Sequence, residues 1–415
     1  MKVALSTLHK DYVLTPTDKA AKNIAIICKT FYINTLLKEL NKDSKSHSTY
    51  EIIHESVDNI IQRHKQEIKK LGFELQNQKL PYLMWIPKLH KQPSKQRFIA
   101  VSYDCTTKVV SQTITSCLKL IQAANRLYCK RIQAYTGWNY MWIIQNSQEI
   151  FGKLKGKIRN VKTYDFSTLY TTIPHPKLIK ELSEIIRNAF KGMKSSFIKP
   201  LKSSARWAKK ISGNRLHINC ESLIKMIEWL INNTYVTVGD QIFRQKIGIP
   251  MGTDCAPYLA NLFLYAYEFR FMKNTLKAKN FKLLHQFTRS CRYIDDLLLI
   301  NNDNKMESYK NLIYPPELLL TSEDKQDQIV NYLDLTLSIK DNDINYKIYD
   351  KRDSFNFPIV NFPNLFGNIP KSHSYGVFIS QLVRFARGCK TFSDFKFRTI
   401  TLVNRLLNNI SKEQN

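Results

Sequence analysis

The segment Tyr293-Ile294-Asp295-Asp296, followed by Leu297-Leu298-Leu299-Ile300, carries the strongest structural signal in this chain of 415 residues. Apolar residues on both sides of two adjacent acids predict a β-hairpin over 291–300, with the acids at its turn. Acids between buried strands are costly unless a cation neutralises them. Two-metal phosphoryl transfer uses such acids, because Mg²⁺ prefers carboxylate oxygens and two ions about 4 Å apart activate the attacking hydroxyl and the leaving group. For this tetrapeptide alone, an ordinary turn that uses Asp for its geometry is an equal alternative.

A third acid stands earlier in the chain, in the stretch Tyr164-Asp165-Phe166. Residues 160–166 have the pattern of a strand, and Asp165 falls near its end, where a carboxylate can project towards a neighbouring hairpin. A lone Asp at a strand end is more often a helix cap or a turn residue. Its significance lies in the pairing with the hairpin acids. We therefore expect Asp165, Asp295 and Asp296 to converge on one site.

A glycine-containing loop, Gln245-Lys246-Ile247-Gly248-Ile249-Pro250-Met251-Gly252, lies between these two motifs. The chain has only 12 glycines, and two of them fall here, four residues apart, just before an apolar stretch over 257–271 that predicts a buried helix. Glycine lets the backbone approach a ligand closely. The loop therefore suits contact with a base pair, although a plain loop before a helix is an equal alternative.

Basic side chains stand further upstream, on a predicted β-hairpin over 81–101. Lys88 and Arg97 could hold a triphosphate there, and Arg97 is the better candidate because its guanidinium binds phosphate through two parallel hydrogen bonds. In so basic a chain, however, any single Lys or Arg is more often a solvated surface residue.

The composition points to a polyanionic partner. Lys and Arg outnumber Asp and Glu by 63 to 34, which gives a net charge of +29 and an isoelectric point near 9.7. Such an excess favours nucleic-acid binding through phosphate contacts. The sequence contains no apolar run of membrane-spanning length and no apolar segment of a secretory signal at its start, which favours an intracellular protein. The eight cysteines form no Cys-x-x-Cys pair, so neither a zinc site nor a disulfide framework is indicated.

The pattern of strands and helices predicts an α+β fold, since the regular βαβ spacing of a doubly wound sheet is missing. Residues 1–75 have mainly helical periodicity and are expected to form an N-terminal helical extension. Hairpins are predicted over 235–245 and 333–348, and two helices after residue 374. Residues 191–215 carry eight basic residues and no acid, which is typical of a solvated insertion that could face nucleic acid.

Together, these motifs and their order resemble reverse transcriptases, and in detail the Penelope-like retroelement branch, which is related to telomerase. The resemblance covers nearly the whole chain. The matching segments are Pro16-Thr17-Asp18-Lys19-Ala20, Ile86-Pro87-Lys88-Leu89-His90-Lys91, Asp165-Phe166-Ser167-Thr168-Leu169-Tyr170-Thr171-Thr172-Ile173-Pro174-His175, Gly248-Ile249-Pro250-Met251-Gly252-Thr253-Asp254-Cys255-Ala256-Pro257, Tyr332-Leu333-Asp334-Leu335, Tyr349-Asp350-Lys351-Arg352-Asp353 and Tyr375-Gly376-Val377-Phe378-Ile379-Ser380-Gln381-Leu382-Val383-Arg384-Phe385-Ala386-Arg387.

The resemblance implies a right-hand polymerase with fingers and palm over 76–340 and a connection with a helical thumb over 341–415. Its expected activity is RNA-directed DNA polymerisation, with an RNA template, a DNA primer and deoxynucleoside triphosphates as partners. Two Mg²⁺ ions, which Mn²⁺ could replace, would be bound by the catalytic carboxylates Asp165, Asp295 and Asp296, with Asp296 the least certain in direct coordination.

The resemblance also implies roles for residues around the aspartates. The implied nucleotide-binding residues are Lys88, Arg97, Phe166, Tyr170, Gln245 and Gly252, with Tyr170 beneath the sugar of the incoming nucleotide. Arg384 and Arg387 would share a helix face on the nucleic-acid backbone. Lys325 is the nearest candidate for a proton donor to pyrophosphate.

Two further expectations concern the whole protein. Many members of this branch carry a GIY-YIG nuclease after the polymerase, and we find no such motif, so either the nuclease is lost or the chain is part of a longer reading frame. A nuclear location is expected, for synthesis primed at the target DNA. The alternative function is that of a catalytically inactive, nucleic-acid-binding remnant of a retroelement.

Overall fold

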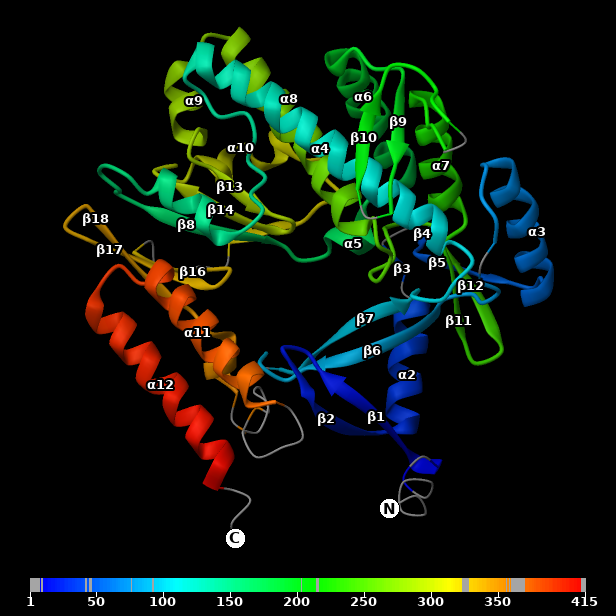
Figure 1. Ribbon diagram of the computed structural model, residues 1–415, viewed down its shortest axis with the longest axis horizontal. Coiled ribbons are helices and arrows are strands. Elements are labelled where there is room, and N and C mark those ends of the chain that lie inside the picture. Colours follow the sequence, from blue (N-terminus) through cyan, green and yellow to red (C-terminus); the bar gives the residue numbers. More distant parts are fainter. Residues whose placement is uncertain are drawn as a thin grey trace.

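Two sheets and several long helices form the main body of the chain (Figure 1). In this computed structural model, the described residues are 8, 10–41, 43–44, 47–75, 77–91, 93–202, 204–213, 216–322, 328–355, 357, 359 and 370–411. Within these residues, strands and helices are mixed without parallel βαβ repeats, which confirms the predicted α+β class.

A four-stranded antiparallel sheet carries the three predicted site acids. Its strand order is β13-β14-β8-β15, so β8 pairs with strands that follow it by more than a hundred residues. The predicted strand over 160–166 and the predicted hairpin over 291–300 are both confirmed. The strands are β8 (Val161–Phe166), β13 (Cys291–Tyr293), β14 (Asp296–Ile300) and β15 (Leu320–Ser322).

Helices cover this sheet and provide the largest hydrophobic core. The apolar side chains of α8 are buried almost all round, as expected of a helix enclosed by other elements. In Figure 1, α4 and α8 cross above the sheet and α6 and α7 lie beside α4. The helices are α4 (Lys108–Thr136), α5 (Leu169–Thr172), α6 (His175–Met193), α7 (Cys220–Asn232), α8 (Ala256–Lys277), α9 (Phe281–Phe287) and α10 (Lys305–Ile313). A 3-10 helix, η1 (Ser147–Lys153), precedes β8.

The second sheet has five strands in the order β5-β12-β11-β6-β7. Its hairpin β6–β7 is the predicted basic hairpin, and β11–β12 is the predicted hairpin over 235–245. Since β5 belongs to residues 1–75, one strand of the predicted N-terminal extension is part of this sheet. The strands are β5 (Tyr50–Ile53), β6 (Tyr82–Lys88), β7 (Lys95–Val101), β11 (Tyr235–Val238) and β12 (Gln241–Gln245).

The expectation of a mainly helical N-terminus is only partly right. Residues 12–28 form a β-hairpin, β1 (Tyr12–Thr17) and β2 (Ala20–Cys28), before α2 (Lys29–Leu40) and, later, α3 (Val57–Lys70). The apolar residues of β2 are spaced every two residues as well as every three or four, and their β-branched side chains favour a strand. Short strands β3 (Asp43–Ser44) and β4 (His47–Ser48) follow α2.

A third sheet and two helices form the C-terminal part, around a second hydrophobic core. The predicted hairpin over 333–348 and the two predicted helices are confirmed. A boundary at residue 340 would divide this hairpin between its two strands. The elements are β16 (Ile329–Tyr332), β17 (Leu335–Lys340), β18 (Asp343–Ile348), η2 (Lys351–Ser354), α11 (Lys371–Gly388) and α12 (Phe392–Ser411).

The basic stretch 191–215 contains a short hairpin, β9 (Phe197–Pro200) and β10 (Ala205–Ala208), that packs against α4. Trp207 lies edge-on to Phe190 of α6, with ring centroids 5.1 Å apart, so the stretch is anchored to the main core. None of the helices in the described part of the chain is long and apolar enough to span a membrane.

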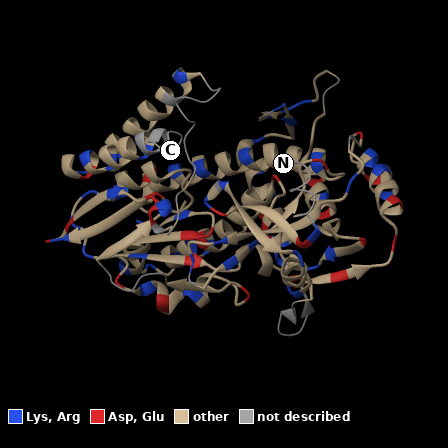
Figure 2. Ribbon diagram, turned by 90° about the horizontal axis from the view of Figure 1, so that it is seen from below, with Lys and Arg blue, Asp and Glu red and all other residues tan. Residues whose placement is uncertain are grey.

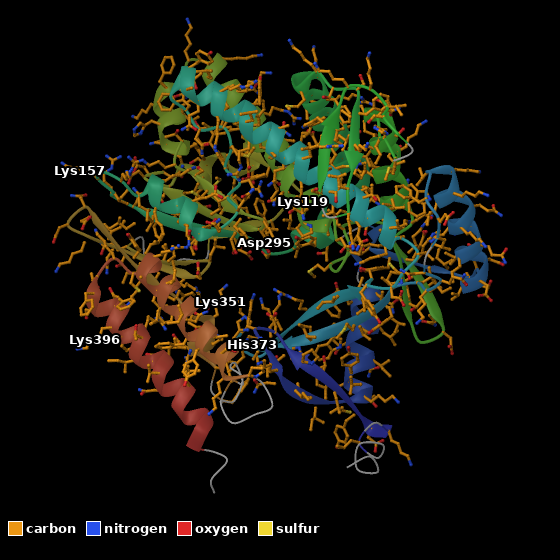
Figure 3. The ribbon with its side chains drawn as sticks, viewed as in Figure 1. Lys119, Lys157, Asp295, Lys351, His373 and Lys396 are labelled. Atoms are coloured by element: carbon orange, nitrogen blue, oxygen red, sulfur yellow. The ribbon has the colours of Figure 1, made fainter. Side chains whose placement is uncertain are left out.

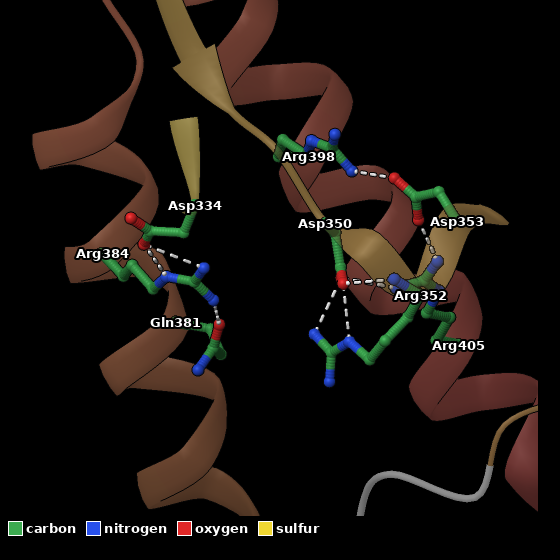
Figure 4. Close-up of polar contacts among 8 residues, drawn as sticks. All are labelled: Asp334, Asp350, Arg352, Asp353, Gln381, Arg384, Arg398 and Arg405. Atoms are coloured by element: carbon green, nitrogen blue, oxygen red, sulfur yellow. Dashed lines mark hydrogen bonds and ion pairs between the residues drawn. The ribbon is translucent and has the colours of Figure 1, made fainter. Parts of the chain in front are cut away.

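An Asp–Arg network joins the segment after β18 to α12 (Figure 4). Asp350 accepts hydrogen bonds from Arg352 at 2.7 and 2.8 Å and from Arg405 at 3.1 Å. Asp353 accepts from Arg398 at 2.7 Å and from Arg405. Burial alone would raise the pKa of Asp350, but the hydrogen bonds and charges of the arginines outweigh it and lower the pKa to about 2. This network therefore depends on an ionised Asp350.

The network should give the fold a dependence on acid. Because the pKa of Asp350 is below its ordinary value, its ionised form stabilises the fold above about pH 4, and this contribution is lost as the pH falls through about 2. We expect Asp350→Asn to lower the free energy of unfolding by about 2 kcal/mol at neutral pH, at about 1.4 kcal/mol per pKa unit. The difference from the wild type should shrink below about pH 4 in urea titrations. The exposed turn residue Asp341, changed to Asn, is the control, and a difference that did not change with pH would contradict the assignment.

Candidate functional site

The acids of the two sequence motifs meet on the four-stranded sheet. Asp165 of β8 is the direct cross-strand partner of Asp296 of β14, so their side chains leave the same face of the sheet. Asp295 is the adjacent turn residue, and its carbonyl accepts a hydrogen bond from the Phe166 amide at 3.2 Å. The register thus places Asp296, and not Asp295, directly opposite Asp165.

The turn that presents the two acids has an unusual backbone. Tyr293 and Asp296 are paired across the hairpin, and Ile294 between them has a φ of +57°. A β-branched residue rarely adopts this left-handed region, and a strained conformation must be held by its surroundings. Backbone strain of this kind is concentrated at functional sites, which supports the prediction that this hairpin is part of the functional site.

Positive charges from two other parts of the chain act on Asp295. Burial raises the pKa of the Asp295 carboxyl, while the charges of Arg97, Lys351 and Arg292 lower it in part. Arg97 is on β7 and Lys351 is in η2, so the site is approached by the β6–β7 hairpin and by the segment after β18. Figure 3 shows Asp295 near the middle of the molecule, above Lys351 and His373.

The basic pair predicted from the sequence lies on one face of β6–β7. Arg97 is opposite Ile86, two residues before Lys88, so Lys88 and Arg97 point to the same side. Arg97 forms an ion pair of 3.0 Å with the buried Asp18. Burial and then the Arg97 charge lower the pKa of Lys88, whereas Asp18 and Asp165 act in the opposite direction. The charges of the predicted basic residues therefore act on two of the predicted acids, Asp165 and Asp295.

Tyr170 is also close to the acids. Its side chain is half-buried at the edge of the main core, and burial followed by the negative charge of Asp295 raises its pKa above the ordinary value. Its carbonyl accepts a hydrogen bond from the Ile249 amide at 2.6 Å. This position is compatible both with a ring beneath a bound sugar and with simple packing under the glycine loop.

The two glycines of the loop lie against the chain's own backbone. A Cβ at Gly248 would be 2.4 Å from the Tyr170 carbonyl oxygen, and a Cβ at Gly252 would be 2.0 Å from that of Ala100. Their φ angles are +92° and +116°. The backbone of this loop thus approaches closely, as predicted, but the groups that it contacts are the backbones of α5 and β7. The buried His175 adds a hydrogen bond of 2.7 Å to the Gly248 carbonyl.

Gly252→Ala is expected to disrupt this junction. The methyl group cannot avoid the Ala100 backbone, so β7 or the loop must move, and we expect a loss of about 2–4 kcal/mol in the free energy of unfolding, measured in urea. Gly239→Ala is the matched control, because Gly239 also has a positive φ, but a methyl group there would have no atom within 4 Å. Equal losses in both variants would show that backbone conformation alone is responsible.

Two predicted nucleotide contacts are buried instead. Phe166 is 2% exposed and lies edge-on to Tyr314, with ring centroids 4.9 Å apart. Gln245 is 3% exposed, and its amide donates to the Ile247 carbonyl at 2.9 Å. Both side chains are therefore enclosed by protein, Phe166 in the core and Gln245 under the glycine loop, and the nucleotide contacts expected of them stay predictions.

The C-terminal arginines differ from each other. Arg384 donates to Asp334 at 3.0 and 3.2 Å and to Gln381 at 3.2 Å, so it ties α11 to the turn between β16 and β17 (Figure 4). Arg387 is exposed one turn later. A phosphate contact by Arg384 would have to share or break its ion pair. Lys325 lies outside the described residues.

The acids suit magnesium in their chemistry. In the described part of the chain, no group of three or more His, Cys, Asp or Glu side chains could hold a metal ion by itself. Mg²⁺ in nucleotide enzymes, however, is bound by one or two carboxylates together with waters and substrate phosphates. The facing pair Asp165 and Asp296 provides such a ligand set, with Asp295 next to it.

Two residues near the site do not stand out in the sequence. Asp18, which holds Arg97, belongs to the matching segment 16–20, but nothing in that segment indicates an ion pair with a strand about eighty residues away. Lys351 is one of many lysines, and only the fold shows that its charge reaches Asp295.

Solved structures with a similar fold include telomerases. The telomerase from Candida albicans, solved with a TWJ fragment of telomeric RNA, has a TM-score of 0.57 at 12% identity, covering 92% of this chain and 59% of that chain. The apo telomerase from Candida tropicalis has a TM-score of 0.52 at 11% identity, covering 98% of this chain and 66% of that one. At such identities, the similarity shows the fold alone. This chain is also shorter and spans only 59% of the first telomerase.

Comparison with protein families and with curated proteins gives no match. The assignment of a function therefore depends on the site itself and on the telomerase-like fold.

Proposed function

We propose that this chain is an RNA-directed DNA polymerase of the Penelope-like type, which extends a DNA 3′-hydroxyl on an RNA template. The observation that carries the proposal is the register that sets Asp165 opposite Asp296, beside Asp295, on one sheet. The charges of Lys88 and Arg97, which act on these acids, and the telomerase-like fold support it. A nuclear role in a retroelement is part of the same proposal and follows from the sequence motifs.

In this proposal, the parts of the chain take the roles of a right hand. The four-stranded sheet with its helices would be the palm, the five-stranded sheet with β6–β7 the fingers, and α11 with α12 the thumb. Lys and Arg are spread over almost all of these elements and not confined to one patch (Figure 2). Such a distribution suits a partner whose phosphates extend across several elements.

In this proposal, the acids, the basic pair and Tyr170 each take a role in nucleotidyl transfer. Two Mg²⁺ ions, bound by Asp165, Asp296 and Asp295, would activate the 3′-hydroxyl and stabilise the charge on the phosphates. Arg97 and Lys88 would hold the triphosphate, Arg97 in an orientation set by Asp18. The 3′-hydroxyl would lose its proton to water, and its oxygen would form a bond to the α-phosphorus as the bond to the leaving pyrophosphate breaks. Tyr170 would lie beneath the sugar of the incoming nucleotide.

A binding protein without catalysis is the second candidate. It is favoured by the net charge of +29, which supports RNA binding without any catalytic step. Such a protein would use the same basic surfaces to hold RNA.

Primer extension distinguishes the two candidates. With poly(rA)/oligo(dT), dTTP and Mg²⁺, we expect the purified chain to lengthen the primer and to do so faster on RNA than on a DNA template of the same sequence. A filter-binding assay on the same template and primer is the control for binding. Strong binding without any extension, with Mg²⁺ or Mn²⁺, would favour the binding protein.

A further inference from the structure

A fully buried ion pair lies directly behind the acidic turn. Arg292 of β13 and Glu268 of α8 both have no exposed side-chain surface. The Arg292 Nε donates to Glu268 Oε1 at 2.5 Å, and Nη2 donates to Oε2 at 3.1 Å. Removing two charges from water is costly, so a buried pair of this kind requires good geometry and further hydrogen bonds.

The remaining guanidinium hydrogens all have acceptors. A guanidinium has five N–H donors, and here Nη1 donates to Asn261 Oδ1 and to the Ile294 carbonyl, both at 2.8 Å, while Nη2 also donates to the Asn261 carbonyl at 3.1 Å. On the other side, the Tyr314 hydroxyl donates to Glu268 at 3.0 Å. All five N–H groups of the Arg292 guanidinium are thus hydrogen-bonded, which fixes its orientation.

One of these acceptors is part of the site. The Ile294 carbonyl belongs to the turn residue with a φ of +57°, immediately before Asp295. Arg292 therefore connects the strained turn to α8, a helix with 13 buried residues. Its positive charge also acts on Asp295, where it partly opposes the effect of burial on that carboxylate.

We propose that Arg292 is a positioning residue that fixes the turn of Asp295 and Asp296 for metal binding. Its charge, on the side of the turn that faces α8, also offsets part of their negative charge. This inference rests on the proposed polymerase function, which it deepens. Partners that orient metal ligands typically change metal affinity or activity by about 10–100-fold when they are removed. A residue that only stabilised the core would not change metal affinity in a folded variant.

The test is Arg292→Lys, which keeps the charge next to Glu268 but cannot reach Ile294 and Asn261 together. We expect Mn²⁺, titrated as the probe and followed by electron paramagnetic resonance, to bind about tenfold more weakly. In primer extension, kcat should fall by about 10–100-fold, whereas the KM for dNTP should change less than about threefold. Arg270→Lys is the matched control, because Arg270 is on the same helix as Glu268 and pairs with Glu181.

The Mn²⁺ affinities and the extension rates together test the role of Arg292. A folded Arg292→Lys variant with unchanged Mn²⁺ affinity overturns the inference, even if its extension rate falls. If Arg292→Lys does not fold, Glu268→Gln takes its place, since the amide keeps the size but provides one acceptor instead of two, and unchanged Mn²⁺ affinity there overturns it equally. If the wild type binds Mn²⁺ and Arg292→Lys binds it more weakly, but no protein extends a primer, the proposed function fails while the role of Arg292 stands.

Discussion

Replacing Asp165 by asparagine is expected to lower primer extension by at least about a thousand-fold, which corresponds to about 4 kcal/mol of transition-state stabilisation. The amide has the shape of the carboxylate but only one oxygen and no charge, so it cannot share two cations with Asp296. The pairing of β8 with β14 uses backbone groups and should persist. RNA affinity should therefore stay within about threefold of the wild type, because binding depends on the basic surfaces.

The measurement is single-turnover extension of a labelled primer, with filter binding on the same preparation. Asp240→Asn, at the exposed turn of β11–β12, makes the same chemical change away from the site and should have no effect. Asp295→Asn and Asp296→Asn, measured in parallel, decide which hairpin acid matters more, and the register favours Asp296. An Asp165→Asn variant within tenfold of the wild type would rule out two-metal catalysis at this sheet.

The second large effect is expected at Tyr170. If its ring lies beneath the incoming sugar, it leaves no room for a 2′-hydroxyl and no partner for that group's lost hydration. Tyr170→Val should then raise kcat/KM for ribonucleotides relative to deoxynucleotides by about a hundred-fold or more, at about 1.4 kcal/mol per decade. Much of the deoxynucleotide activity should remain.

Two variants serve as comparisons for Tyr170→Val. Tyr170→Phe keeps the ring and should keep the selectivity, because the exclusion is steric and does not need the phenol. Tyr267→Val replaces another half-buried tyrosine at the edge of the same core. It should leave the preference for deoxynucleotides over ribonucleotides unchanged. Parallel loss of all activity and stability in Tyr170→Val would instead identify Tyr170 as a packing residue under the glycine loop.

The elements that carry the site are predictable because their sequence patterns are local. The apolar run after Asp296 and the turn at Gly239-Asp240 each define a hairpin without help from the rest of the chain. Residues 12–28 are harder to predict, since Ile24 and Ile27 satisfy a helical spacing while Ile24 and Ile26 satisfy that of a strand. Pairing with β1 decides between them, and no local pattern contains that information.

The side chains around the acids are predictable only in part. Asp165 and Arg97 stand out because one is an acid at a strand end that pairs with a second acidic motif and the other lies in a basic hairpin. Phe166 and Gln245 directly adjoin site motifs, yet they point into the protein, and this direction depends on how the strand or loop lies in the sheet. Arg292 does not stand out although it is a charged residue before a buried strand, because its partners Glu268 and Asn261 come from α8.

Gly248 and Gly252 have a consequence for how copies of this gene would diverge. Every amino acid other than glycine has a Cβ, so each missense change at these codons places an atom against Tyr170 or Ala100. At Gly239 the space is open, so only its positive φ restricts substitution. In a collection of related copies, substitutions at the first two codons would therefore mark those no longer under selection for an intact fold, whereas a substitution at Gly239 would be weaker evidence.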